Sequence, residues 1–137
     1  MNVLIFGAGS IGNHLANASR YLNWKVTVLD IDSKALIRMK NEIYPSRYGS
    51  WDSSINLIEN ISDVKFKPDF VIIGTPPDSH LKLALKALYF EPKGILIEKP
   101  LCTPSMEGLS ELKNAINQSS TKAYVGYNHV LGKASQK

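Results

Sequence analysis

The chain has 137 residues, of which 44% are hydrophobic and 20% are charged, a balance that suits one domain of ordinary size with its own core. A single cysteine, Cys102, excludes an internal disulfide framework and favours a reducing compartment. The formal charge of +4 comes from sixteen basic residues scattered among twelve acidic ones without a basic block, so we do not expect a nucleic-acid partner.

No apolar run in the sequence approaches the roughly 20 residues that a membrane-spanning helix requires. The apolar stretch near the N-terminus has no basic residue before it and is interrupted by Gly7 and Gly9, unlike a secretory signal. We therefore expect a cytoplasmic protein that has no membrane partner.

Five short apolar runs indicate strands. They lie, in chain order, at residues 3–6, 26–29, 70–73, 95–97 and 123–125. Each run is continuous rather than alternating, which is typical of a strand that is buried on both faces of a parallel sheet.

Four segments between these runs carry apolar residues at helical spacing. Their stripes are Ile11, Leu15, Ala18 and Leu22; Leu36, Met39 and Ile43; Leu81, Ala84, Leu85 and Leu88; and Leu109, Leu112 and Ile116. Because parallel strands need crossovers, the alternation predicts right-handed βαβ units. The expected fold is therefore α/β, a doubly wound, mostly parallel Rossmann sheet with helices on both faces.

Residues that begin or end helices support these boundaries. Asp32 or Ser33 can cap the second helix, and Pro45 lies just past its expected end. Thr103 can cap a later helix that has Pro104 at its first position.

The stretch 45–60 shows no clear period. We expect a short edge strand near Tyr48 and a short helix within residues 53–59, although Gly49, Trp51 and Asp52 could equally belong to a loop.

Residues 7–12 read Gly-Ala-Gly-Ser-Ile-Gly, a GxGxxG pattern that directly follows the first strand and opens the first helix. In that context the first glycine permits a tight turn, the second lets the backbone approach a pyrophosphate, and the third lets the helix pack on the strand. The free N–H groups at the helix start favour the phosphate charge. The candidate cofactor-binding residues here are Gly7, Gly9, Ser10, Ile11 and Gly12.

Asp30 ends the second strand eighteen residues after Gly12, near the offset of about 20 at which an acidic residue accepts hydrogen bonds from the adenosine ribose. Its carboxylate would repel a 2′-phosphate, and neither Ile31 nor Asp32 supplies an arginine. The expected cofactor is therefore NAD, with NADP less favoured. A purely structural alternative for Asp30 is that it caps the helix after it.

Three later segments narrow the assignment. They read Ile-Ile-Gly-Thr-Pro-Pro-Asp-Ser-His at 72–80, Ile-Glu-Lys-Pro-Leu at 97–101 and Val-Gly-Tyr-Asn at 125–128. Together with the glycine loop, they make the chain resemble the N-terminal domain of the glucose-fructose oxidoreductase / inositol dehydrogenase (Gfo/Idh/MocA) family from about Met1 to His129. The Glu-Lys-Pro segment is the most discriminating of them.

The resemblance implies reversible hydride transfer between nicotinamide and a carbinol carbon of a sugar, polyol or sugar derivative. It implies that Lys99 takes part in proton transfer at the substrate hydroxyl and that Glu98 organises the strand end beside the cofactor. A solvated lysine at a strand end is the alternative. Pro100 restricts Lys99 to an extended backbone or a cis bond, which fixes where its ammonium points.

The resemblance also places Thr75, Pro76 and His80 on the loop beside the nicotinamide and its ribose, and Asn128 on the segment that reaches the active site. His80 could instead cap or pack at the start of its helix. Independently of any family, ligands of open α/β sheets bind outside the carboxyl ends of the strands, where the candidate residues are expected to converge.

The resemblance implies a division of the chain into an NAD-binding domain at 1–128 and the start of a linker at 129–137. The family's second, substrate-binding domain would lie beyond, so we expect this chain alone to be inactive. Members associate through that domain, which is compatible with a homo-oligomer. Three alternatives stay open: a non-catalytic NAD sensor, a subunit of a split enzyme, and a Rossmann domain for another nucleotide such as a methyl donor.

Overall fold

The computed structural model describes residues 1–127. The strands are β1 (Asn2–Phe6), β2 (Lys25–Leu29), β3 (Ile55–Ile58), β4 (Phe70–Ile73), β5 (Gly94–Glu98) and β6 (Lys122–Gly126). The α-helices are α1 (Ser10–Tyr21), α2 (Ser33–Arg38), α3 (Tyr44–Tyr48), α4 (His80–Leu88) and α5 (Leu109–Asn117). A π-helical turn, η1 (Met39–Ile43), joins α2 to α3, and two 3-10 turns, η2 (Ile61–Asp63) and η3 (Pro77–Ser79), complete the elements.

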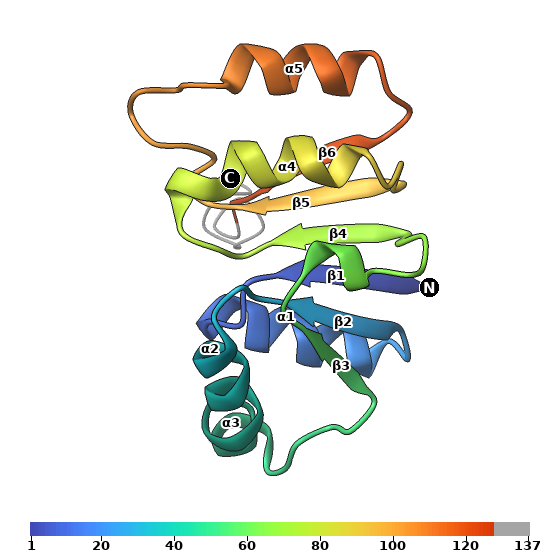
Figure 1. The fold of residues 1–137 in the computed structure, drawn as a ribbon, viewed down its shortest axis with the longest axis vertical. Coiled ribbons are helices and arrows are strands. Elements are labelled where there is room, and N and C mark those ends of the chain that lie inside the picture. Colours follow the sequence, from blue (N-terminus) through green and yellow to red (C-terminus); the bar gives the residue numbers. More distant parts are fainter. Residues whose placement is uncertain (128–137) are drawn as a thin grey trace, which may run out of the picture.

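All six strands form one parallel sheet in the order β3-β2-β1-β4-β5-β6 (Figure 1). The five strands predicted from the sequence and the doubly wound fold are confirmed. The chain winds outward from β1 in one direction and from β4 in the other. Strand order therefore reverses between β1 and β4, which is where doubly wound sheets bind their ligands.

The two faces of the sheet bury separate apolar cores. On β1, Val3 and Ile5 pack in a cluster with residues of α1, α2 and η1, while Leu4 and Phe6 pack in a second cluster with residues of α4 and α5. Figure 1 shows α1 and α4 on opposite faces. Both faces of the strand are apolar, so its sequence runs continuously instead of alternating. No helix within residues 1–127 has the length and apolar character to cross a membrane.

The stretch 45–60 folds in the opposite order to the prediction. Tyr48 ends helix α3 instead of forming an edge strand, and the expected helix at 53–59 is the edge strand β3. Pro45 does not end the helical run, because the π-helical turn before it restarts the helix and leaves Pro45 in the first turn of α3. The Tyr44 ring packs edge-on against the rings of Tyr48 and Trp51, at centroid distances of 4.9 and 5.2 Å.

Helix α1 packs on the sheet with a different face from the predicted stripe. Its buried residues are Gly12, Asn13, Ala16 and Ser19, whereas Ile11 and Leu22 are 40% and 56% exposed. The small side chains let the helix lie close to the strands, and this close approach outweighs the burial of larger apolar residues.

The last helix begins later than Thr103 and Pro104 suggest. The Thr103 hydroxyl hydrogen-bonds the Ser105 hydroxyl, and residues 103–108 form turns. Met106 and Gly108 adopt positive φ values of 52° and 85°, which a helix cannot include, so α5 starts after Gly108.

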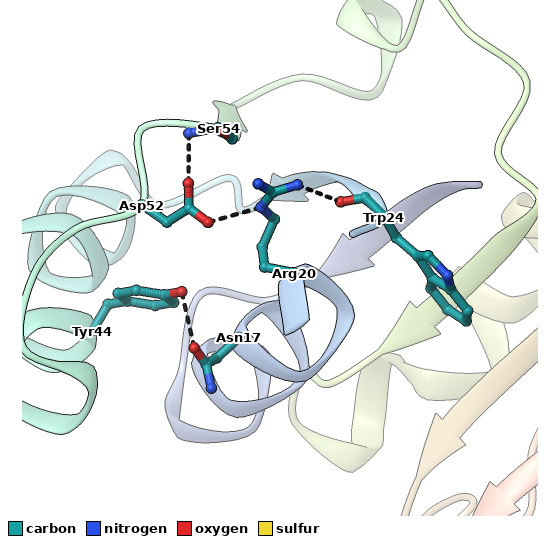
Figure 2. A network of polar contacts seen from close by, with 6 residues as sticks. All are labelled: Asn17, Arg20, Trp24, Tyr44, Asp52 and Ser54. Atoms are coloured by element: carbon teal, nitrogen blue, oxygen red, sulfur yellow. Dashed lines mark hydrogen bonds and ion pairs between the residues drawn. The ribbon is translucent and has the colours of Figure 1, made fainter. Parts of the chain in front are cut away.

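A polar network ties α1 to the segment that leads into β3. Figure 2 shows the Arg20 guanidinium between the Asp52 carboxylate and the Trp24 carbonyl, at 2.8 and 2.7 Å. Asp52 also accepts a hydrogen bond from the Ser54 N–H. The hydrogen bond from Arg20 lowers the pKa of Asp52, outweighing the opposing effect of burial.

This lowered pKa predicts a stability contribution with a definite pH window. A carboxyl group whose pKa is lowered by folding stabilises the folded state at pH values above its pKa in the unfolded chain, about 3.9. This stabilisation is lost as the pH falls through the lower pKa of the folded state. We expect Asp52→Asn to lower the free energy of unfolding at pH 7 by up to about 1 kcal/mol, and the difference to shrink near pH ~3. Urea unfolding at both pH values measures the free energy of unfolding, with the exposed Glu111→Gln as control. If Asp52→Asn lowered this free energy equally at both pH values, the prediction would be contradicted.

Candidate functional site

An open groove of about 440 Å³ lies at the carboxyl ends of β1, β2 and β4. Five of the candidate residues line it: Gly7, Gly9, Asp30, Thr75 and Pro76. The groove therefore joins the glycine loop, the acidic end of β2 and the loop after β4 at the point where strand order reverses.

Gly7 and Gly12 are glycines because the fold leaves no room for a side chain. Gly7 has φ of +103°, and a Cβ there would lie 2.9 Å from the Gly74 carbonyl oxygen. A Cβ at Gly12 would lie 1.9 Å from the Gly7 carbonyl oxygen. These two positions close the turn and bring α1 onto β1, as the motif predicts.

Gly9 differs from both, because nothing in the fold requires it to be glycine. Its φ of −77° suits any residue, and a Cβ built on it meets no atom within 4 Å. The space above this residue is open to the groove that it lines. A bare backbone beside open space fits a ligand that lies directly against the main chain.

The start of α1 presents unpaired donors at the same place. Gly9 is the N-cap and provides no side-chain hydrogen bond, and the first turn contains no acidic residue. In residues 1–127 no acceptor bonds the N–H groups of Ser10 and Ile11. Free N–H groups and the positive end of the helix dipole suit an anion such as a pyrophosphate.

Asn13, in the first turn of α1, holds the glycine loop and was missed by the sequence analysis. Its side chain is fully buried, and its amide nitrogen donates to the carbonyl oxygens of Ala8 and Gly9 at 3.0 and 2.9 Å. Because C=O and N–H point in opposite directions across a trans peptide, holding these carbonyls inward turns the N–H groups of Gly9 and Ser10 the other way. The sequence feature that could have revealed Asn13 is a polar residue one position after the glycine motif, on the face of α1 that packs on the sheet.

Asp30 is held by the backbone on both carboxylate oxygens. One oxygen accepts from the Ala8 N–H at 2.8 Å and the other from the Asp32 N–H at 2.9 Å. The cap of α2 is Asp32, which accepts from the Lys34 N–H. A carboxylate has about four acceptor positions, so Asp30 keeps capacity for two more donors in the groove.

Arg38 enters the groove although the sequence analysis found no arginine near Asp30. It comes from the last turn of α2 and lines the groove together with Ile31 and Ala35. Ala35 and Arg38 lie three positions apart on α2 and therefore share one side of the helix, a pattern that was readable once α2 was known. The groove therefore has a cation as well as an anion at its β2 end.

The loop after β4 is fixed by a chain of hydroxyl groups. The Ser79 hydroxyl lies 2.6 Å from the Thr75 hydroxyl and donates to the Pro76 carbonyl at 2.8 Å. Since the single Ser79 proton is used on Pro76, the Thr75 hydroxyl donates to Ser79. This relay holds the Thr75-Pro76 wall of the groove in one conformation.

His80 is placed differently from the expected cofactor contact. It is 1% exposed, and its two ring nitrogens lie 2.8 Å from the Pro100 carbonyl oxygen and 2.6 Å from the Thr75 carbonyl oxygen. The ring has no nitrogen left for a ligand. His80 instead connects the loop after β4 to the loop after β5.

Lys99 follows β5 and is exposed, and its peptide bond to Pro100 is cis. Its backbone N–H contacts the Glu98 carboxylate at 3.3 Å. A Cβ at Gly126 would lie 2.8 Å from that carboxylate, so Glu98 packs against the end of β6. Neither Glu98 nor Lys99 lines the groove described above. Asn128 lies outside the described residues.

Comparison with known proteins identifies the family. The family model described as "Oxidoreductase family, NAD-binding Rossmann fold", that of Gfo/Idh/MocA, matches residues 1–127. The chain belongs to this family. The resemblance drawn from the glycine loop and the Glu-Lys-Pro segment is thereby confirmed, and NAD is the cofactor that the family binds. No protein with a curated description matches the sequence significantly.

Solved structures share the fold of this Gfo/Idh/MocA domain at low sequence identity. UDP-N-acetylglucosamine 3-dehydrogenase GnnA from Acidithiobacillus ferrooxidans has a TM-score of 0.79 at 19% identity, over 99% of this chain and 41% of its own. The WlbA dehydrogenase from Chromobacterium violaceum, in complex with NADH and UDP-GlcNAcA, has a TM-score of 0.77 at 20% identity, over 99% of this chain and 37% of its own. Myo-inositol 2-dehydrogenase from Lactobacillus plantarum has a TM-score of 0.74 at 20% identity, over 97% of this chain and 38% of its own. The chain thus spans about two fifths of these structures.

Proposed function

We propose that this chain is the NAD-binding domain of an oxidoreductase that transfers a hydride between nicotinamide and a carbinol carbon of a sugar, polyol or sugar derivative. The observation that carries the proposal is Gly9, whose bare backbone lies beside free N–H groups and open space in the groove. The family match and the names of the structural relatives support the oxidoreductase class and the sugar-like substrate.

Different residues of the groove would bind different parts of the cofactor. The N–H groups at the start of α1 would bind the pyrophosphate, and the free acceptor positions of Asp30 would bind ribose hydroxyls. Apolar residues of the groove, Phe6, Leu29 and Leu83 among them, suit an adenine ring. The Thr75-Pro76 wall would support the opposite end of the molecule.

When bound, NAD supplies a carbon that accepts or releases a hydride. Lys99 stands at the carboxyl end of β5, on the same edge of the sheet as the groove. We assign it the proton transfer: its amine takes the proton of the substrate hydroxyl as the carbinol carbon gives up its hydride, and its ammonium returns it in the reverse direction. Glu98 would hold the backbone from which Lys99 projects.

We propose that the cofactor domain covers residues 1–128, that a linker begins at 129, and that Asn128 reaches the active site. A second substrate-binding domain would exclude water and orient the substrate, so this chain alone is expected to bind cofactor without turnover. We further propose a cytoplasmic enzyme that assembles as a homo-oligomer and does not bind nucleic acid.

Fluorescence titration of the chain with NADH and NADPH tests the proposal. We expect NADH to bind and NADPH to bind more weakly, because the Asp30 carboxylate repels a 2′-phosphate. Asp30→Ala should lower the affinity for NADH about 10-fold and narrow the difference in affinity between NADH and NADPH. Asp30→Asn, which keeps one acceptor oxygen for the loop, should weaken NADH less.

Arg38 provides the matched control, because it lines the same end of the groove with the opposite charge. Arg38→Ala should reduce NADPH binding more than NADH binding and so widen the preference. A parent chain that binds neither nucleotide would overturn the proposed function. A parent that prefers NADPH would contradict the assignment of Asp30.

A further inference from the structure

Arg47, in the last turn of α3, reaches the start of α1. Its guanidinium donates to the Ser10 carbonyl oxygen at 2.9 Å and to the Ser10 hydroxyl oxygen at 2.8 Å. The next residue, Tyr48, makes a second contact with the helix, because its hydroxyl lies 3.1 Å from Nδ1 of His14. The end of α3 is thus joined to the first turn of α1, beside the glycine loop.

The charge of Arg47 is unusual at this place. The start of a helix carries the positive end of the helix dipole, which favours anions and disfavours cations. The first turn of α1 has no acidic residue, and Arg47 forms no ion pair with a carboxylate in residues 1–127. The fold therefore gathers a guanidinium, free N–H groups and a helix start without an anion from the chain to balance them.

We propose that Arg47 is a further binding residue for the pyrophosphate of the dinucleotide, an inference that rests on the proposed function. Arg47 acts in two ways. Its cation adds to the positive potential at the phosphates, and its hydrogen bond orients the Ser10 side chain as a phosphate donor.

The orientation follows from the proton inventory of Ser10. A hydroxyl carries one proton and two acceptor positions. Arg47 has only donors to offer, so the Ser10 oxygen accepts from Arg47 and its proton must point elsewhere. Ser10 is an exposed residue in the first turn of α1, where the N–H groups of Ser10 and Ile11 have no acceptor within residues 1–127, so we expect its proton to point to the same anion. A phosphate oxygen there would accept from the Ser10 hydroxyl while Arg47 polarises it.

The test separates phosphate binding from nucleoside binding. We expect Arg47→Met to weaken NADH and ADP about 5- to 10-fold and to leave adenosine, which has no phosphate, unchanged. The salt dependence of ADP binding should become shallower, because one cation is lost near the phosphates. Arg47→Lys should restore the charge but only part of the affinity, because it lacks the fork that bonds both Ser10 oxygens.

A double-mutant cycle with Ser10→Ala tests whether Arg47 acts by orienting the Ser10 hydroxyl. Arg47→Met should cost less affinity in the Ser10→Ala background than in the parent. Lys113→Met, which removes an exposed cation from α5, is the control and should change no affinity. Thermal unfolding of each variant shows whether the fold is intact, and Arg47 is exposed enough to be replaced without loss of core packing.

The outcomes distinguish this inference from the proposed function. NADH binding that is unaffected by Arg47→Met would overturn the inference alone. An equal loss for adenosine and ADP would also overturn it, because it would indicate a structural effect on the whole groove. A parent chain that binds neither NADH nor ADP would overturn both, and additive effects in the cycle would contradict the role of the Ser10 hydroxyl.

Discussion

Gly9→Ala is expected to abolish most NADH binding while leaving the stability of the chain nearly unchanged. The added methyl group would project into the open space beside Gly9, where we propose that the pyrophosphate binds against the backbone. Overpacking of this kind costs about 1–3 kcal/mol, which corresponds to a loss of affinity of about 5- to 150-fold.

The stability of this variant should stay near that of the parent for two opposing reasons. Alanine is a poorer N-cap than glycine by up to about 1 kcal/mol, but it restricts the unfolded chain and regains about 0.4–1 kcal/mol. The φ of −77° at Gly9 imposes no strain on alanine. Urea unfolding measures the stability, and fluorescence titration with NADH measures the affinity.

Gly12→Ala is the matched comparison, because it places the same methyl group one helical turn further on. Its Cβ would lie 1.9 Å from the Gly7 carbonyl oxygen, so α1 must move away from β1. We expect a loss of about 3 kcal/mol or more in the free energy of unfolding. If Gly9→Ala binds NADH as tightly as the parent, the phosphate does not approach the loop at Gly9.

The strands were predictable because burial on both faces leaves a strong local signal. Val3, Leu4 and Ile5 are fully buried on alternating faces, and the sequence shows this as an unbroken apolar run. The glycine motif was predictable for a similar reason, since the turn, the close packing and the open backbone each require glycine at a fixed spacing.

The region 45–60 was not predictable from local pattern, because non-local contacts decide it. Proline in a helix interior normally breaks the helix, whereas here a π-helical turn precedes Pro45 and the Tyr44 ring packs against Trp51. Strand β3 has four residues, one of them Asn56, and its strand conformation depends on pairing with β2.

The parts of the candidate site that the sequence did not reveal are those that come from elsewhere in the chain. Arg47 meets Ser10 across 37 positions, so no motif spacing contains it. Arg38 required the length of α2 to be known, and Asn13 required knowledge of which face of α1 is buried. Side chains that orient a backbone leave weaker sequence patterns than the glycines that shape it.

His80→Phe is expected to destabilise the chain by about 2–4 kcal/mol. Phenylalanine keeps a ring of similar size but removes both nitrogens, and with them the polar contacts to the carbonyl groups of Thr75 and Pro100. A buried polar group without a partner costs about 1–3 kcal/mol. The two loops at the ends of β4 and β5 would also lose their connection, and NADH affinity should fall several-fold because the Thr75-Pro76 wall of the groove loosens.

Two amide variants separate the contacts. In His80→Asn the amide nitrogen lies near the place of Nδ1 and can donate to Pro100, while in His80→Gln it lies near the place of Nε2 and can donate to Thr75. Each should recover part of the stability that phenylalanine loses in urea unfolding. Because Thr75 borders the groove, the glutamine variant should recover more NADH affinity than the asparagine variant. If His80→Phe is as stable as the parent, the imidazole does not hold the two loops together.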